Sequence, residues 1–140
     1  MSVRAAAALE NRPPDLPARG RACYSEGMLL ATPAPPYVAI IFTSMRTADD
    51  DAGYQAMAVE MERLAARQPG YLGIESARGA DGLGISVSYF RTADDARGWK
   101  AHADHLGAQR LGRERWYRAY SVRIAEVQRE YAFDRDGSAK

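Results

Sequence analysis

The stretch from Gln68 to Phe90, QPGYLGIESARGADGLGISVSYF, decides the fold class. Within it, Tyr71–Ala77 and Leu83–Phe90 are rich in β-branched and aromatic residues, which predicts two strands. Gly79-Ala80-Asp81-Gly82 lies between them, and its Asp-Gly pair is typical of a hairpin turn. The stretch therefore predicts an antiparallel β-hairpin in the middle of the folded unit.

A strand and a helix are predicted on the N-terminal side of this hairpin. Val38–Phe42 is apolar and rich in β-branched residues, which indicates a buried strand. Pro69-Gly70 ends the helix that follows it. The apolar face of that helix recurs at intervals of three and four and consists of Tyr54, Met57, Ala58, Met61, Leu64 and Ala65.

A second helical region and a last strand are predicted on the C-terminal side. Residues Thr92–Tyr117 have a helical pattern that several glycines interrupt, which predicts a break near residues 103–107. Tyr120–Tyr131 predicts a long strand. Its apolar positions change phase between Ile124 and Ala125, which indicates a β-bulge there or burial on both faces.

The pentapeptide Arg-Thr-Ala-Asp-Asp occurs twice, at residues 46–50 and 91–95, each time between a predicted strand and a predicted helix. In both copies the threonine and the last aspartate have the spacing of a capping box, Thr47 with Asp50 and Thr92 with Asp95. The elements then run βαββαβ. This order predicts an α+β, ferredoxin-like fold with helices on one face of a four-stranded antiparallel sheet.

The prolines divide the chain. Six of the seven lie in the first 36 residues, in a segment with no apolar period. We expect residues 1–36 to be a disordered Ala/Pro/Arg-rich extension, residues 37–133 to be one domain and residues 134–140 to be a flexible tail. A translation start at Met28 is a further hypothesis.

Composition excludes several classes of protein. One cysteine cannot form an internal disulfide or a cysteine-rich zinc module. The apolar runs are far shorter than the ~20 residues of a membrane span. With 19 basic and 18 acidic residues, no charge excess points to nucleic acid. We therefore expect a cytoplasmic protein that binds neither nucleic acid nor membranes.

Both faces of the predicted strand Leu83–Phe90 lack charge. One face carries Leu83, Ile85, Val87 and Tyr89, and the other carries Ser86, Ser88 and Phe90. Helices are expected to cover only one face of the sheet. We therefore expect a homodimer in which two sheets close into a barrel and bury the other face.

The second helical region contains both histidines and both tryptophans of the chain. On a continuous helix, six of its residues would span an arc of roughly 120° around Leu106. Such a mixture is typical of a mostly apolar ligand pocket with a few polar groups. Core packing of the tryptophans and a solvated face for the histidines and arginines are the alternatives. The six residues are Trp99, His102, His105, Gln109, Arg113 and Trp116.

Other chemistry has little support in the sequence. Two histidines without a third ligand make a weak metal site, so no metal is expected. The single cysteine lies in the extension, which argues against a cysteine nucleophile.

Several segments resemble the antibiotic biosynthesis monooxygenase family of dimeric α+β barrels. The resemblance covers residues 37–133 and implies that fold and a homodimer. The family includes cofactor-independent oxygenases of quinol or anthrone-type polyketides, haem-degrading enzymes and domains with no known reaction. The segments are Tyr37–Ser44, Gln68–Gly73, Glu75-Ser76, Ile85–Phe90 and Trp99–His102.

The haem-degrading branch of this family has an Asn on the first strand, a Trp on the second helix and a His ten residues later. Trp99 matches the tryptophan, but the residue ten positions later is Gln109, and the domain contains no asparagine. His105 could substitute as an iron ligand, but haem is not the expected cofactor.

The resemblance implies a reaction without a cofactor, in which O₂ is the co-substrate of an aromatic, quinol or polyketide-like molecule. A base removes an acidic proton, and the resulting anion reduces O₂. Histidine titrates near neutral pH, so His102 and His105 are the candidate catalytic bases. Gln109 is a candidate to hold a ketone or peroxide oxygen. Trp99 and Trp116 are candidate aromatic walls, and Arg113 is a candidate anion contact at the rim. The alternative is a non-catalytic dimeric domain that binds a small molecule or serves in a stress response.

Overall fold

The computed structural model describes residues 29–105 and 107–135, and for residues 105, 108 and 109 it describes the backbone only. Of the predicted extension and tail, only residues 29–36, 134 and 135 fall within these ranges, and Met28 lies outside them. The elements are β1 (Tyr37–Arg46), α2 (Asp51–Ala65), β2 (Tyr71–Arg78), β3 (Leu83–Phe90), α3 (Ala93–His105), α4 (Ala108–Leu111), a π-helical turn η2 (Gly112–Trp116) and β4 (Tyr117–Val127).

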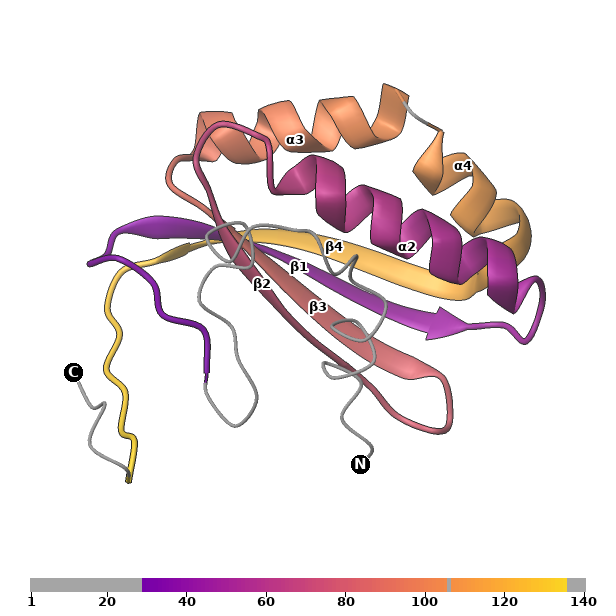
Figure 1. Cartoon of the computed structure of the whole chain (residues 1–140), viewed down its shortest axis with the longest axis horizontal. Coiled ribbons are helices and arrows are strands. Elements are labelled where there is room, and N and C mark those ends of the chain that lie inside the picture. The colour runs from indigo at the N-terminus through magenta and orange to yellow at the C-terminus, as the bar shows by residue number, and fades with distance from the viewer. Residues whose placement is uncertain (1–28, 106, 136–140) are drawn as a thin grey trace.

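The strands form one antiparallel sheet in the order β2-β3-β1-β4. Helices α2, α3 and α4 lie on the same face of this twisted sheet (Figure 1). The ferredoxin-like α+β fold expected from the element order is therefore confirmed.

The central hairpin forms as its residues predict. Strand β3 has the predicted bounds, and β2 extends one residue further, to Arg78. In the turn, the Leu83 amide donates to the Asp81 carboxylate at 3.0 Å, and the Gly82 amide donates to the Gly79 carbonyl at 3.1 Å. Gly82 has a φ of 96°, a conformation that favours glycine. The Asp-Gly chemistry therefore closes the hairpin.

The two copies of the pentapeptide cap their helices differently. In the second copy, Thr92 Oγ1 accepts from the Asp95 amide at 3.0 Å, which is the predicted N-cap bond of α3. In the first copy the predicted Thr47 cap is wrong. Asp50 caps α2 by accepting from the Gly53 amide at 3.2 Å, while Thr47 Oγ1 donates to the Arg115 carbonyl at 2.6 Å. The Thr47 hydroxyl is thus engaged in a tertiary contact, and the N-cap of α2 is Asp50, three residues after Thr47.

The helical region breaks at Gly107, which has a φ of 78°, and the predicted break is confirmed. The predicted single arc from Trp99 to Trp116 is therefore wrong, because the helix axis changes direction at this glycine. Figure 1 shows α3 and α4 running in different directions.

The last strand runs from Tyr117 to Val127, so it begins three residues earlier and ends four residues earlier than predicted. Its register against β1 shifts beside Arg46, which pairs with Tyr117 while Met45 pairs with Ala119. The bulge therefore lies at Arg118, and the predicted bulge near Ile124 is wrong. Residues 123–126 are exposed, so the alternative of burial on both faces is wrong as well.

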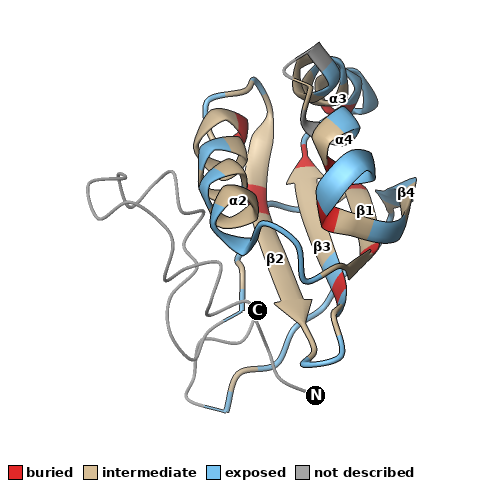
Figure 2. Cartoon of the chain, turned by 90° about the vertical axis from the view of Figure 1, so that its right-hand side faces the viewer, coloured by how far each residue is buried: buried red, intermediate tan, exposed pale blue. Residues whose placement is uncertain are grey.

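The main core lies between α3 and the sheet. Phe90 and Ala96 are fully buried and pack with Val38, and Ile40, Tyr71 and Trp99 pack against this cluster. Helix α2 contributes no residue to this cluster, and its one buried residue is Ala65. Figure 2 shows α2 almost entirely intermediate or exposed. The buried core thus lies under α3, and α2 packs more loosely on the sheet.

The other face of the sheet carries apolar side chains. Leu83 and Ile85 are 43% and 46% exposed, as the alternation in β3 predicts. On the same face, the Tyr89 hydroxyl donates to Glu75 at 3.0 Å, and burial raises the pKa of Tyr89 well above its ordinary value. The Leu30 amide also donates to Glu75, at 3.3 Å, so the segment before β1 contacts the sheet.

Gly70 joins α2 to β2 with a φ of 78°, and a Cβ atom there would overlap the Asp95 carboxylate. We expect Gly70→Ala to lower the free energy of unfolding by about 1–2 kcal/mol, because an L-residue is strained in this conformation. Gly98→Ala is the control. Position 98 is helical with open space around it, so alanine should stabilise by up to about 1 kcal/mol. Thermal melts that shift in the same direction for both variants would contradict this account.

Candidate functional site

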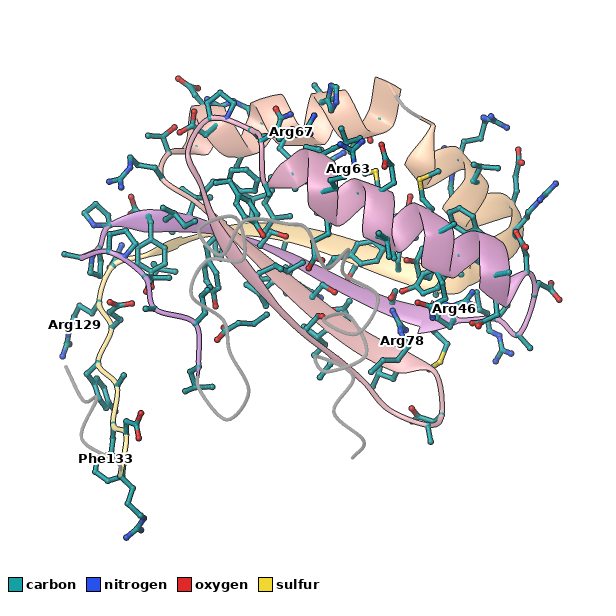
Figure 3. All side chains as sticks on the ribbon, viewed as in Figure 1. Arg46, Arg63, Arg67, Arg78, Arg129 and Phe133 are labelled. Atoms are coloured by element: carbon teal, nitrogen blue, oxygen red, sulfur yellow. The ribbon has the colours of Figure 1, made fainter. Side chains whose placement is uncertain are left out.

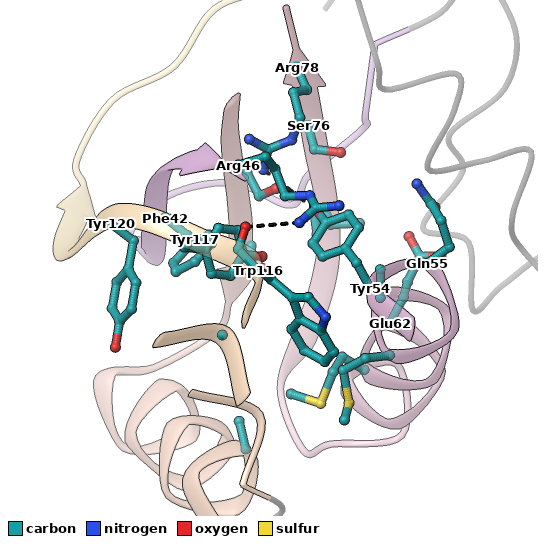
Figure 4. Close-up of a pocket in the computed structure, with 18 of the residues that line it drawn as sticks. Phe42, Arg46, Tyr54, Gln55, Glu62, Ser76, Arg78, Trp116, Tyr117 and Tyr120 are labelled. Carbon is teal, nitrogen blue, oxygen red and sulfur yellow. Dashed lines mark hydrogen bonds between the residues drawn. The ribbon is translucent and has the colours of Figure 1, made fainter. Parts of the chain in front are cut away.

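A cavity of about 490 Å³ lies between the helices and the sheet, where α2 packs loosely (Figure 4). Short side chains on the helix-facing side of β2 and β3, namely Ser76, Ser86 and Ser88, leave this space. Its volume is typical of a small-molecule site. The larger lining side chains are Phe42, Arg46, Tyr54, Met57, Met61, Glu62, Tyr71, Arg78, Trp99, Lys100, Trp116, Tyr117 and Tyr120.

Aromatic rings form much of the cavity wall. Trp116 is buried, and its ring packs edge-on against Tyr54 with centroids 6.0 Å apart. The centroid of the Phe42 ring lies 5.3 Å from the ring centroids of both Tyr117 and Tyr120. Such contacts hold flat surfaces in fixed positions, which suits an aromatic ligand.

Trp116 also connects two loops. Its indole Nε1 donates to Asp50 Oδ2 at 3.2 Å, and its carbonyl accepts from the Thr47 amide at 2.8 Å. The indole bond, followed by the Gly53 amide, lowers the pKa of the Asp50 carboxyl. The cap of α2 and the start of β4 are therefore held together beside the cavity.

The end of the cavity under the start of α2 is cationic. Figure 3 shows Arg46 and Arg78 next to each other there. Arg46 Nη1 donates to the Trp116 carbonyl at 2.8 Å, and its Cζ lies 3.9 Å from the centre of the Tyr54 ring. Arg78 Nη2 donates to Ser44 Oγ at 2.7 Å and to the Tyr54 hydroxyl at 3.5 Å. Arg46 also pairs with the exposed carboxylate of Asp51 at 3.1 Å. Both guanidinium groups are thus fixed in place around the cavity, and these contacts of Arg78 are to neutral groups.

Tyr117 lies beside this cationic end, with its ring 5.9 Å from that of Tyr54. Burial raises the pKa of the Tyr117 hydroxyl well above its ordinary value, and the neighbouring Tyr54 raises it further. Tyr117 is therefore a neutral phenol at physiological pH and can donate a hydrogen bond to a ligand.

The structure brings together only part of the predicted site. Trp99 and Trp116 line the cavity, and Trp99 also packs on the core. His102 lies against Trp99, with ring centroids 5.9 Å apart, but is absent from the described cavity lining.

Arg113 is exposed and donates to the hydroxyl of Tyr120, which does line the cavity, at 3.0 Å. The side chains of His105 and Gln109 lie outside the described residues.

The arginines and tyrosines of the cationic end were not predicted as site residues. A signal was present in the strands, because Ile74, Ser76 and Arg78 alternate on one face of β2 and line the cavity. Arg46 belongs to the first pentapeptide, which the sequence explained as helix capping. An arginine at the end of an inward-facing strand pattern is the feature that could have identified this end.

The described residues also bear on two other kinds of feature, a metal site and a membrane-spanning helix. In the described part of the chain, no three His, Cys, Asp or Glu side chains are grouped as metal ligands. Among residues 29–105 and 107–135, no helix has the length and apolar character needed to cross a membrane.

No known family model matches the sequence. The chain is 48% identical to the uncharacterized protein YqjZ of Bacillus subtilis over 105 residues, which are 75% of this chain and 91% of YqjZ.

Solved structures share the fold at low sequence identity. SnoaB of Streptomyces nogalater, a cofactor-independent oxygenase, is 14% identical with a TM-score of 0.54, over 70% of this chain and 97% of SnoaB. A Nitrosomonas europaea protein provisionally named an antibiotic biosynthesis monooxygenase is 20% identical with a TM-score of 0.53, over 70% and 95% of the two chains. The protein NE2512 of Nitrosomonas europaea, of unknown function, is 9% identical with a TM-score of 0.53, over 71% and 96%. The chain therefore belongs to the family of YqjZ and has the fold of the antibiotic biosynthesis monooxygenases.

Proposed function

We propose that this protein is a cofactor-independent monooxygenase that oxidises an aromatic, quinol or polyketide-like small molecule in the cavity between the helices and the sheet. The observation that carries the proposal is the aromatic lining of a cavity of about 490 Å³. The fold shared with SnoaB, a cofactor-independent oxygenase, supports the same reaction class.

The proposed chemistry needs no electrons from a cofactor. A base removes a proton from an acidic ring carbon or phenol, and the anion transfers electrons to O₂. One oxygen atom bonds to the ring carbon. The other leaves as water with the two hydrogens of a CH₂ group, so that CH₂ and O₂ give C=O and H₂O. The substrate is the reductant, and the protein supplies deprotonation, orientation and exclusion of water.

We assign the base to His102 or His105 and the contact to the ketone or peroxide oxygen to Gln109. The contact of His102 with Trp99, a cavity residue, supports a position next to the substrate. Catalytic hydrogen bonds often tighten only when substrate is bound, so the absence of His102 from the described lining is compatible with this role. Trp99 and Trp116 are the aromatic walls, and Arg113 acts at the rim through Tyr120.

The His102→Ala/His105→Ala double variant should lose about 100-fold to 10 000-fold of its turnover, the usual contribution of a general base. Turnover of a dihydroxynaphthalene and anthrone panel is followed with an oxygen electrode, in air and under nitrogen. Arg110→Gln, at an exposed position on α4, is the control and should keep full activity. Unchanged turnover in the double variant would remove both histidines from the mechanism.

The second candidate is a non-catalytic dimeric domain that binds a small molecule. The absence of His102 from the described cavity lining favours it. Tight binding of the aromatic panel without oxygen consumption by the wild type would select this candidate.

We also propose that the protein is a homodimer that buries the open face of the sheet, where Leu83 and Ile85 are exposed. Native mass spectrometry of the wild type should give twice the chain mass. Ile85→Glu should give the monomer, because it places a charge in the interface. Ala101→Glu, at an exposed position on α3, should remain a dimer. A monomeric wild type would contradict this assembly.

A further inference from the structure

The cationic end of the cavity has more positive charge than its carboxylates balance. The Arg46 side chain is 8% exposed, and its carboxylate partner is Asp51, 3.1 Å away, whose side chain is 73% exposed. The partners of Arg78 in the described chain are neutral: Ser44 Oγ, the carbonyls of Ser44 and Gly82, and the Tyr54 hydroxyl. Neutral dipoles hold a guanidinium in place without cancelling its charge, so a positive potential extends into the cavity.

Other charged groups around the cavity do not change this picture. Lys100, on α3, pairs with Asp104 at 3.2 Å. Glu62 also lines the cavity, but it is eight residues after Tyr54 on α2, about 12 Å further along the helix. Figure 4 shows Tyr54 and Glu62 on α2, and Arg46 and Arg78 close together on the strand side of the cavity. The cavity therefore has a cationic end and, along α2, a carboxylate at a distance from it.

The two tyrosines at this end add hydrogen-bond donors. The Tyr54 hydroxyl accepts from Arg78, which polarises its own hydrogen for donation. Tyr117 interacts with Tyr54 through its hydroxyl, and burial keeps Tyr117 in the neutral form. Two cations and two phenols thus converge, a set of groups that stabilises an anionic oxygen.

A glycine permits the position of Arg78. A Cβ atom on Gly84 would lie 2.5 Å from Arg78 Cζ, so the guanidinium rests directly on the backbone of β3. Beneath it, Ser44 is 2% exposed and bonds to the same guanidinium. Two small residues on neighbouring strands therefore position the Arg78 guanidinium: Gly84 leaves room for it, and Ser44 bonds to it.

We propose that this end of the cavity is an anion subsite, in which Arg46, Arg78, Tyr54 and Tyr117 receive an ionised oxygen of an aromatic ligand. The ligand class is an aromatic molecule with a carboxylate or an acidic phenol. The inference rests on the proposed function, in that the cavity binds an aromatic small molecule. It adds that contact of the acidic group with this end fixes the orientation of the ring.

Binding is measured by quenching of the tryptophan fluorescence, since Trp99 and Trp116 line the cavity. The probes are 2-naphthoate, its neutral methyl ester and a nitronaphthol that is ionised at neutral pH. Wild-type protein should bind 2-naphthoate at least about tenfold more tightly than the ester. Tight binding of the nitronaphthol as well would extend the class to phenolates, and weak binding would restrict it to carboxylates.

Two variants test the residues. Arg78→Gln removes the charge, and Gly84→Ala keeps it but displaces the guanidinium. Both should bind 2-naphthoate about tenfold more weakly or worse and leave the affinity for the ester unchanged. Arg97→Gln, at an exposed position on α3, is the matched control and should bind like the wild type. Far-UV circular dichroism melts verify folding. If Arg78→Gln unfolds, the comparison rests on Gly84→Ala and on the two probes with wild-type protein.

The results separate this inference from the proposed function. Equal affinity of the wild type for the acid and the ester, with no effect of Gly84→Ala, overturns the anion subsite and leaves the cavity function standing. Failure of all three probes to bind contradicts the proposed function, and the subsite falls with it.

Discussion

Phe90→Ala is expected to lower the free energy of unfolding by about 3–5 kcal/mol. Phe90 is fully buried, packs edge-on against Tyr71 with centroids 5.7 Å apart, and lies in the core under α3. The cavity under α2 leaves this cluster as the main packed core of the described chain. Domains have only about 5–15 kcal/mol of stability, so the variant should lose a large fraction of the stability of the fold.

Urea unfolding followed by circular dichroism measures this change, with Phe133→Ala as the control. Phe133 is 74% exposed on the C-terminal segment, which extends away from the sheet (Figure 3). Its replacement should change stability by no more than about 0.5 kcal/mol. Similar losses in the two variants would show that the core does not lie where the structure places it.

Ser88→Trp is expected to weaken ligand binding about 70-fold without loss of stability. Ser88 lies on the central strand β3, pairs with Ile40 and Ile74, and faces the cavity. An indole there would fill space that the ligand needs. A ligand ring that loses about 100 Å² of apolar contact loses about 2.5 kcal/mol, which is about 70-fold in affinity.

The same fluorescence titration with 2-naphthoate measures this effect. Ser88→Ala, which removes the hydroxyl without filling the cavity, should bind close to the wild type. The unfolding midpoint of Ser88→Trp should not fall, because the indole occupies existing space. Wild-type affinity in a folded Ser88→Trp protein would place the ligand site elsewhere.

Local patterns predicted most of the fold. The alternation in Leu83–Phe90 identified the apolar face and the serine face of β3, and the structure places Ser86 and Ser88 on the cavity side. The glycine interruptions located the helix break at Gly107. Such features depend on backbone geometry and on side-chain periodicity, which neighbouring residues determine.

Tertiary contacts decided the features that the sequence did not predict. Thr47 has the spacing of a cap, but its hydroxyl bonds to the carbonyl of Arg115, 68 residues away. The first pentapeptide therefore differs from the second although the residues are identical. The bulge at Arg118 likewise depends on how β4 pairs with β1, which no local pattern encodes.

The site was predicted only in part for the same reason. The tryptophans were identified because they stand out in composition, and both line the cavity. The arc of six residues assumed one straight helix, and Gly107 separates its two halves. Arg46 and Arg78 come from different strands, and only the folded sheet brings them to Tyr54.

The most direct test of the proposed oxygenase activity is the fate of ¹⁸O₂ during turnover of an anthrone or dihydroxynaphthalene. The protein is first shown by metal analysis and absorption spectroscopy to carry no metal, flavin or haem. We expect one ¹⁸O atom in each product molecule and the other in water, with no reaction under nitrogen. Product oxygen that comes from water, or turnover that proceeds equally well without O₂, would contradict it.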